Sequence, residues 1–122
     1  MGFKTKYVSV KIYRYKELPE LTKDLEYETS DGKIFIVPKG FKTDFASIPR
    51  ILWWLIAPVG KHTLPSVLHD YLYEYGHILD ISRKEADKIF WDANEDSNVA
   101  RLTNNVMWFC VRLFGRKRYK KA

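Results

Sequence analysis

The stretch Leu64-Pro-Ser-Val-Leu-His-Asp-Tyr-Leu-Tyr73 is an apolar, helix-like run that contains two adjacent polar residues, His69 and Asp70. Helical geometry places His69 and Tyr73 on one face, four residues apart, and turns Asp70 about 100° away from His69. A buried or half-buried imidazole next to a carboxylate can orient a water, bind a metal or pass a proton. The pair can equally be a hydrogen-bonded dyad of the core, and both interpretations stay open here.

The second half of the chain is predicted to hold about four helices. Their expected bounds are residues 47–54, 64–75, 82–96 and 98–114. Ser47 before Pro49 is typical of a helix start, and the Ser82 to Glu85 spacing is that of a capping box. Gly115 is expected to end the last helix. Five apolar residues of that helix are predicted to face the core: Val99, Leu102, Val106, Phe109 and Leu113.

The front third of the chain is predicted to be a sheet. Residues 6–14, 25–29 and 33–37 are dominated by β-branched and aromatic side chains. Asp31-Gly32 between the last two of these runs indicates a hairpin, and residues 41–44 are expected to add a short strand. The fold class is therefore α+β: an antiparallel sheet with its hairpin at Asp31-Gly32, followed by a helical block.

Length and composition limit the number of domains and the kinds of segment that the chain can contain. The 122 residues, with 46% hydrophobic and 16% aromatic content, predict one globular domain over residues 1–115. The longest apolar stretch, residues 51–59, is about half of a membrane span, and no leader pattern opens the chain, so neither anchor nor signal peptide is expected. The single cysteine, Cys110, excludes an internal disulfide and a thiolate metal cluster, and its apolar neighbours predict a buried thiol.

The positive charge is concentrated in a C-terminal tail, residues 116–122. The formal net charge is +6, and five cations of the tail supply most of it: Arg116, Lys117, Arg118, Lys120 and Lys121. Such a tail can contact phosphate, lipid headgroups or an acidic partner, or it can simply be solvated. Nucleic acid is not expected as a partner, because no basic stripe alternates with stacking aromatics.

Two further acidic positions are candidates for the same site as His69. Asp44 can supply a carboxylate oxygen to a metal or orient a histidine, although it and Ser47 can also simply cap a helix. The short connection after Gly76 predicts that the helices of residues 64–75 and 82–96 pack antiparallel. Asp87 can then meet the His69 ring and hold its tautomer, or it can pair on the surface with Arg83.

Several separated motifs resemble an uncharacterised family of small proteins encoded by tailed bacteriophages and prophages. They are G-F-K-T-D-F-A-S-I-P (40–49), P-V-G (58–60), L-H-D-Y-L-Y (68–73), S-R-K-E-A-D-K-I-F (82–90) and V-R-L-F-G (111–115). The resemblance implies a phage protein without an established activity. Its expected place is the host cytoplasm when it is synthesised, with the virion as a further expected location.

The H-D-x-x-Y motif of residues 69–73, with A-D at residues 86–87, is also similar to phospholipase A2 of the parvoviral type. This likeness implies that His69 is a general base, that Asp70 is a calcium ligand, and that Tyr73 and Asp87 support His69. The glycine-rich calcium loop of those enzymes is incomplete here, so Asp44 would have to compensate. The sheet at the front of the chain has no counterpart in those enzymes.

Three functions remain open from the sequence. The first is a hydrolase, with calcium as its candidate cofactor, that cleaves an ester or amide of the host envelope. The second is a non-catalytic head, neck or tail accessory subunit or assembly factor, which would contact other virion proteins through tryptophans such as Trp53, Trp54, Trp91 and Trp108. The third and weaker one is a host-takeover protein that binds a bacterial target or nucleic acid through residues 116–121.

Overall fold

The computed structural model describes residues 2–3, 10–11, 20–43 and 61–120. Its strands are β1 (Gly2–Phe3), β2 (Val10–Lys11), β3 (Glu20–Leu21), β4 (Leu25–Glu28) and β5 (Ile34–Val37). Its helices are α1 (Thr63–Leu79), α2 (Arg83–Asp96), α3 (Arg101–Phe114) and a short 3-10 helix, η2 (Gly115–Lys117). The α+β prediction is confirmed. The expected number of about four helices is slightly off, because the described residues hold three α-helices.

The main strands of the sheet form where inward-facing and outward-facing residues alternate along the sequence. β1, β4 and β5 make an antiparallel sheet in the order β1-β4-β5, and β2 pairs with β3. In β4 and β5 the pairs Leu25 with Val37 and Tyr27 with Phe35 face the core, whereas the residues between them are directed outward. Gly32, with φ of 88°, supplies the left-handed conformation in the predicted hairpin turn.

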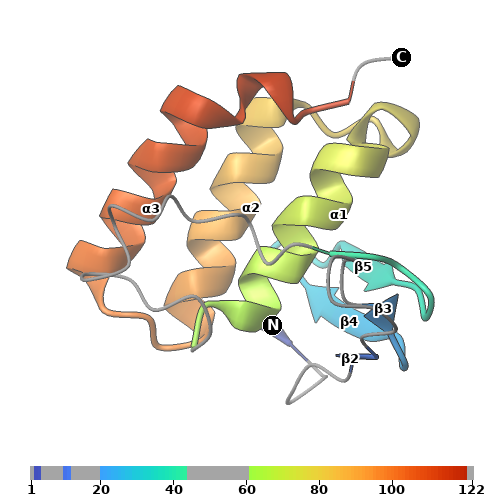
Figure 1. Cartoon of the computed structure of the whole chain (residues 1–122). Coiled ribbons are helices and arrows are strands. Elements are labelled where there is room, and N and C mark those ends of the chain that lie inside the picture. Colours follow the sequence, from blue (N-terminus) through green and yellow to red (C-terminus); the bar gives the residue numbers. More distant parts are fainter. Residues whose placement is uncertain (1, 4–9, 12–19, 44–60, 121–122) are drawn as a thin grey trace.

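The three helices lie side by side with α2 in the middle, and the sheet lies beside α1 (Figure 1). The main core forms between the sheet and α1, and its central apolar residues from α1 are Val67, Leu68 and Leu72. The capping box is confirmed, since Ser82 Oγ accepts a hydrogen bond from the Glu85 amide. No helix within the described ranges is long and apolar enough to cross a membrane.

Several expected elements do not match the structure or fall outside it. The predicted helix of residues 47–54, with Trp53 and Trp54, lies outside the described residues, as does most of the predicted strand of residues 6–14. In place of a strand at residues 41–44, the described part has a single bridge between Glu20 and Lys42. Cys110 is half-buried, and its partial burial raises the pKa of the thiol.

The predicted core face of α3 is largely wrong. Leu102, Phe109 and Leu113 are exposed, whereas Val99 is buried and Val106 is half-buried. The buried side chains of α3 that pack towards α2 are different ones, and the half-buried Val106 and Val111 pack beside them. The buried ones are Met107, which lies against Phe90, and Asn104.

The physical reason for this reversal is a polar contact at the α2–α3 interface. Asn104 accepts a hydrogen bond from the Asn94 side chain and donates to the Trp91 carbonyl and to the Glu95 carboxylate. This buried, hydrogen-bonded asparagine pair takes a position that a hydrophobic pattern assigns to solvent. Apolar periodicity therefore selected the opposite side of the helix.

Helix α1 continues beyond the predicted end at Gly76 to Leu79 and is closed by Asp80, whose φ is 59°. Gly76 is required there for space rather than for its dihedral angles. A Cβ at this position would lie 2.7 Å from the carbonyl oxygen of Ile81 and 3.2 Å from the ring of Tyr119. The glycine thus allows the turn into α2 and the end of the described chain to approach α1 closely.

We expect Gly76→Ala to lower the free energy of unfolding by about 1–3 kcal/mol, as measured by urea denaturation. Alanine is the better helix former by about 1 kcal/mol, so a loss of stability would have to come from the contact with the Ile81 backbone. Lys84→Ala, at an exposed position of α2, is the control and should change stability by less than about 0.5 kcal/mol. A stabilised Gly76→Ala variant would contradict the steric argument.

Candidate functional site

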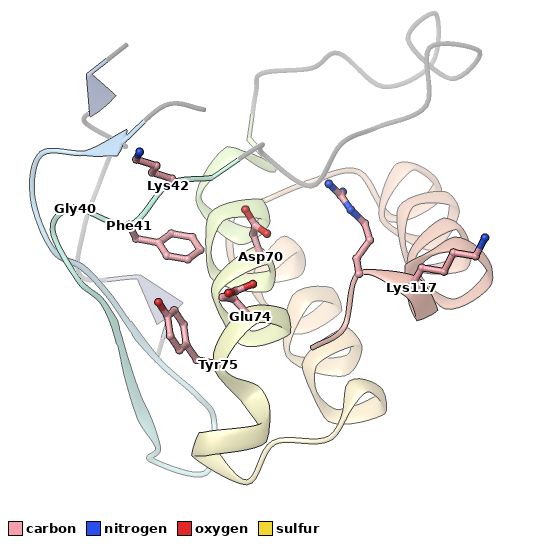
Figure 2. Close-up of a pocket in the computed structure, with 8 residues that line it drawn as sticks. Gly40, Phe41, Lys42, Asp70, Glu74, Tyr75 and Lys117 are labelled. Atoms are coloured by element: carbon pink, nitrogen blue, oxygen red, sulfur yellow. The ribbon is translucent and has the colours of Figure 1, made fainter. Parts of the chain in front are cut away.

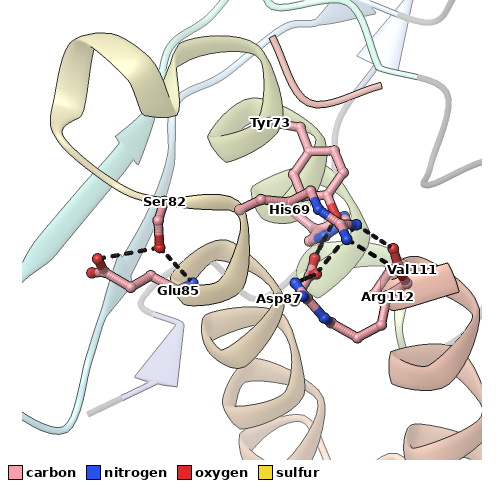
Figure 3. A network of polar contacts seen from close by, with 8 residues as sticks. His69, Tyr73, Ser82, Glu85, Asp87, Val111 and Arg112 are labelled. Carbon is pink, nitrogen blue, oxygen red and sulfur yellow. Dashed lines mark hydrogen bonds and ion pairs between the residues drawn. The ribbon is translucent and has the colours of Figure 1, made fainter. Parts of the chain in front are cut away.

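The contact predicted between α1 and α2 is present at the centre of the molecule. His69 Nε2 lies 2.7 Å from Asp87 Oδ1, and the Tyr73 hydroxyl donates to the same oxygen at 2.5 Å (Figure 3). His69 and Tyr73 stand one turn apart on α1, and Asp87 reaches them from α2. The antiparallel helix pair therefore brings these three candidate residues together.

Two arginines complete the surroundings of the Asp87 carboxylate. Arg112 of α3 places Nη1 2.7 Å from Asp87 Oδ2, and Arg83 places its own Nη1 4.0 Å from that oxygen. Arg83 also donates to the carbonyls of Val111 and Arg112 at 3.1 and 3.0 Å, which are backbone acceptors in the last turn of α3. One carboxylate thus connects side chains from all three helices.

Sequence reasoning identified the Arg83 spacing as a surface pairing, but it did not find Arg112. The i,i+4 geometry between Arg83 and Asp87 does occur, yet Asp87 is fully buried. Arg112 lies 25 residues beyond Asp87, so no helical periodicity relates the two. The only available signal was an arginine within the apolar last turns of α3. A cationic side chain in such surroundings is costly to bury unless a carboxylate pairs with it.

The cluster is almost completely buried. The exposed fractions are 3% for His69, 0% for Asp87 and 4% for Tyr73. Burial by itself would raise the pKa of Asp87, but the hydrogen bonds from His69, Tyr73 and Arg112 outweigh it and lower that pKa. Burial and the hydrogen bond to Asp87 both raise the pKa of the Tyr73 hydroxyl, so Asp87 is ionised and Tyr73 is neutral near pH 7.

The lowered pKa of Asp87 predicts a loss of stability in acid. Its folded-state pKa lies below the unfolded value of about 3.9, so the stabilisation is complete above that pH and disappears as the pH falls through the folded pKa. Between about pH 5 and about pH 3 we expect the wild type to lose more free energy of unfolding than Asp87→Asn, measured by urea denaturation. Equal losses would show that Asp87 does not carry the effect.

The contacts also define the state of the His69 ring. An ionised Asp87 carboxylate can only accept a hydrogen bond, so Nε2 of His69 is the donor in this contact. The ring lies between Tyr73 and Phe90, with centroid distances of 4.1 and 4.7 Å. A histidine ring that a carboxylate holds in one orientation is an arrangement that can support general-base chemistry.

Asp70 lies on another side of α1 and lines a pocket of about 680 Å³ (Figure 2). The pocket is bounded by Gly40, Phe41, Lys42, Asp70, Glu74, Tyr75, Lys117 and Arg118. His69 is not among these described lining residues, so the buried cluster and the pocket are neighbouring features on one helix. Two of the predicted tail contacts, Lys117 and Arg118, belong to the pocket wall.

The remaining candidate residues are distributed around these features. Asp44, Ser47 and Lys121 lie outside the described residues. Within residues 2–3, 10–11, 20–43 and 61–120, no three His, Cys, Asp or Glu side chains form a group that could hold a metal ion. Arg116 is exposed in η2, and Lys120 donates its backbone amide to the Tyr73 carbonyl at 2.9 Å. The described part of the tail therefore packs back onto α1.

Comparison with known proteins places the chain in a family. The model of a protein family of unknown function, DUF1353, matches residues 19–111, and the chain belongs to this family. The match includes α1, α2 and most of α3, and with them His69, Tyr73 and Asp87. No curated protein and no solved structure matches the chain.

Proposed function

We propose that this member of a family of unknown function is a bacteriophage hydrolase in which His69 is the general base. Its proposed substrate is an ester or amide of the host envelope. The observation that carries the proposal is the 2.7 Å contact of His69 Nε2 with a buried, ionised Asp87, which the Tyr73 hydroxyl shares. Supporting it is the likeness of the H-D-x-x-Y and A-D motifs to phospholipase A2, which implies the same supporting roles for Tyr73 and Asp87.

In this proposal Asp87 holds Nε2, and the ring acts through its other nitrogen, Nδ1. Nδ1 takes a proton from a water while the water oxygen bonds to the carbonyl carbon of the substrate. Asp87 stabilises the imidazolium that results, and the proton then passes to the leaving oxygen or nitrogen as its bond to carbon breaks. Arg112 limits the rise in the pKa of Asp87 that burial would cause, which keeps the carboxylate ionised for this task.

Calcium is the cofactor that the phospholipase likeness implies, with Asp70 and Asp44 as its proposed ligands. The described residues do not by themselves fit it. Calcium prefers six to eight oxygen ligands, whereas Asp70 shares its pocket with three cationic side chains, Lys42, Lys117 and Arg118. We therefore propose the base step without a metal step, and the experiment below includes a chelator arm.

A non-catalytic virion protein is the second candidate, and the burial of the cluster favours it. A His-Asp-Tyr-Arg network that is nearly closed to solvent can serve as a conformational lock between helices. In that case the protein is a head, neck or tail accessory subunit or an assembly factor. Mass spectrometry of purified phage particles tests it, and a particle without this chain contradicts it.

A hydrolysis panel separates the two candidates. Purified protein is incubated with phospholipids, peptidoglycan fragments and small ester or amide probes, with calcium or with a chelator. Under the hydrolase proposal at least one substrate is cleaved, and cleavage is lost in His69→Gln but retained in His77→Gln, a substitution two turns further along α1. Absence of cleavage across the panel, or cleavage that survives in His69→Gln, would rule out His69 as the base.

A further inference from the structure

Helix α3 presents an apolar stripe to solvent, which we call the outer face. It consists of Leu102, Phe109 and Leu113, which are 70%, 58% and 56% exposed. At about 100° per residue, these three side chains fall within about 40° of one another and nearly opposite the buried Met107. Phe114 at the end of the helix and the partly exposed Trp108 add further aromatic surface. Large apolar side chains gathered on one helix face mark an interaction surface.

The formal charges of residues 97–122, which include α3, are all positive. Residues 97–122 contain no Asp or Glu and seven cations: Arg101, Arg112, Arg116, Lys117, Arg118, Lys120 and Lys121. Arg101, at the first residue of α3, has a side chain that is 74% exposed and lies 3.5 Å from the Glu95 carboxylate of α2. Arg116 and Lys117 are exposed just beyond the last residue of α3. Arg112 turns inward to Asp87, and Lys120 lies 3.4 Å from Glu74 of α1. The stripe is thus apolar along its length and basic at both ends.

We propose that the outer face of α3 docks on a bilayer surface that contains anionic phospholipids. A helix with Trp, Phe and Leu on one side and Lys or Arg beside them lies in the plane of the membrane interface, with its apolar side among the acyl chains. The flanking cations meet the negative headgroups, and each contributes to attraction near the surface. Docking of this kind needs no spanning helix and does not depend on catalysis at His69.

Charge disfavours a second copy of the chain as the occupant. Two α3 helices packed through their outer faces would bring Arg101 of one copy towards Arg116 and Lys117 of the other if antiparallel, or like onto like if parallel. Neither α3 nor η2 contains an acidic residue, and Glu95 of α2 offsets only the charge of Arg101. An anionic lipid surface satisfies both the apolar stripe and the cations at its ends.

Vesicle flotation tests the proposal with full-length protein. We expect wild type to float with vesicles of phosphatidylcholine and phosphatidylglycerol at low salt and to remain unbound with phosphatidylcholine alone. The double variant Phe109→Asp with Leu113→Asp should reduce the bound fraction by about tenfold or more. The matched control is Ile78→Asp with Leu79→Asp, two exposed apolar residues at the end of α1, which should bind as wild type does.

Two measurements separate membrane docking from effects on folding and from the proposed catalytic activity of His69. Raising the salt from about 50 mM to about 500 mM NaCl should release wild-type protein from the vesicles, which needs no variant. His69→Gln should float like wild type, so loss of catalysis and loss of docking are distinguished. The proposal is overturned if wild type does not float with anionic vesicles. It is equally overturned if the outer-face variant, folded by circular dichroism, floats as wild type does.

Discussion

Replacing Asp87 by alanine is expected to lower the free energy of unfolding by about 3–5 kcal/mol. The carboxylate is fully buried and is bonded by His69 Nε2, the Tyr73 hydroxyl and Arg112 Nη1. Its removal leaves a buried imidazole, a buried hydroxyl and a partly buried guanidinium without their acceptor. Breaking one side of a buried ion pair costs much more than the pair contributes, because the remaining charge keeps its desolvation penalty.

Urea denaturation at pH 7 measures this loss, and Asp92→Ala on the same helix is the matched control. Asp92 is only half-buried. Its partial burial and the nearby Asp96 and Glu95 carboxylates raise its pKa, and the Lys88 ammonium partly opposes this rise. Removing that carboxylate should therefore change stability by less than about 1 kcal/mol. If the Asp87 and Asp92 variants were equally stable, the network would not hold the three helices together.

Replacing His69 by glutamine is expected to reduce hydrolysis of the substrate found in the panel by about 10²–10⁴-fold. Glutamine retains a polar group next to Asp87 but has no nitrogen that can accept a proton at neutral pH. Because His69 is buried, the variant will also lose some stability. The rates should therefore be compared well below the midpoint of thermal unfolding of each protein.

A second variant separates the base role of the ring from its role in packing. In Asp87→Asn the side-chain amide can donate a hydrogen bond to Nε2, which moves the ring proton to Nδ1 and blocks the proposed base atom. Activity should fall as steeply as in His69→Gln. Tyr73→Phe removes only one of the hydrogen bonds to Asp87 and should have a much smaller effect. Full activity in Asp87→Asn would contradict the assignment of Nδ1.

The parts of the fold that follow from local chemistry were predictable. Asp31-Gly32 between two alternating runs predicted the hairpin, and the Ser82 to Glu85 spacing predicted the start of α2. The contact of His69 with Asp87 could also be predicted, because the short connection between their helices favours an antiparallel helix pair. Each of these features depends on residues close together in the sequence or on a single helix-to-helix step.

What could not be predicted depends on contacts between distant residues. Gly76 lies inside α1 rather than at its end, and it meets the side chain of Tyr119, 43 residues later. The orientation of α3 depends on Asn104 meeting Asn94, a polar contact that hydrophobic periodicity does not register. The hydrogen bond of Arg112 to Asp87 could not be predicted either, because it forms only when α3 packs on α2. Long-range polar contacts override local pattern at these three places.

The two arginines make the ends of the helices mutually dependent. Arg83 of α2 holds the closing carbonyls of α3, while Arg112 of α3 reaches back to the carboxylate on α2. Fraying of the last turn of α3 would remove the acceptors of one guanidinium and displace the other in the same event. This corner should therefore open as one cooperative unit rather than residue by residue. A disturbance of α3 would then reach the His69 imidazole on α1 through Arg112 and the Asp87 carboxylate.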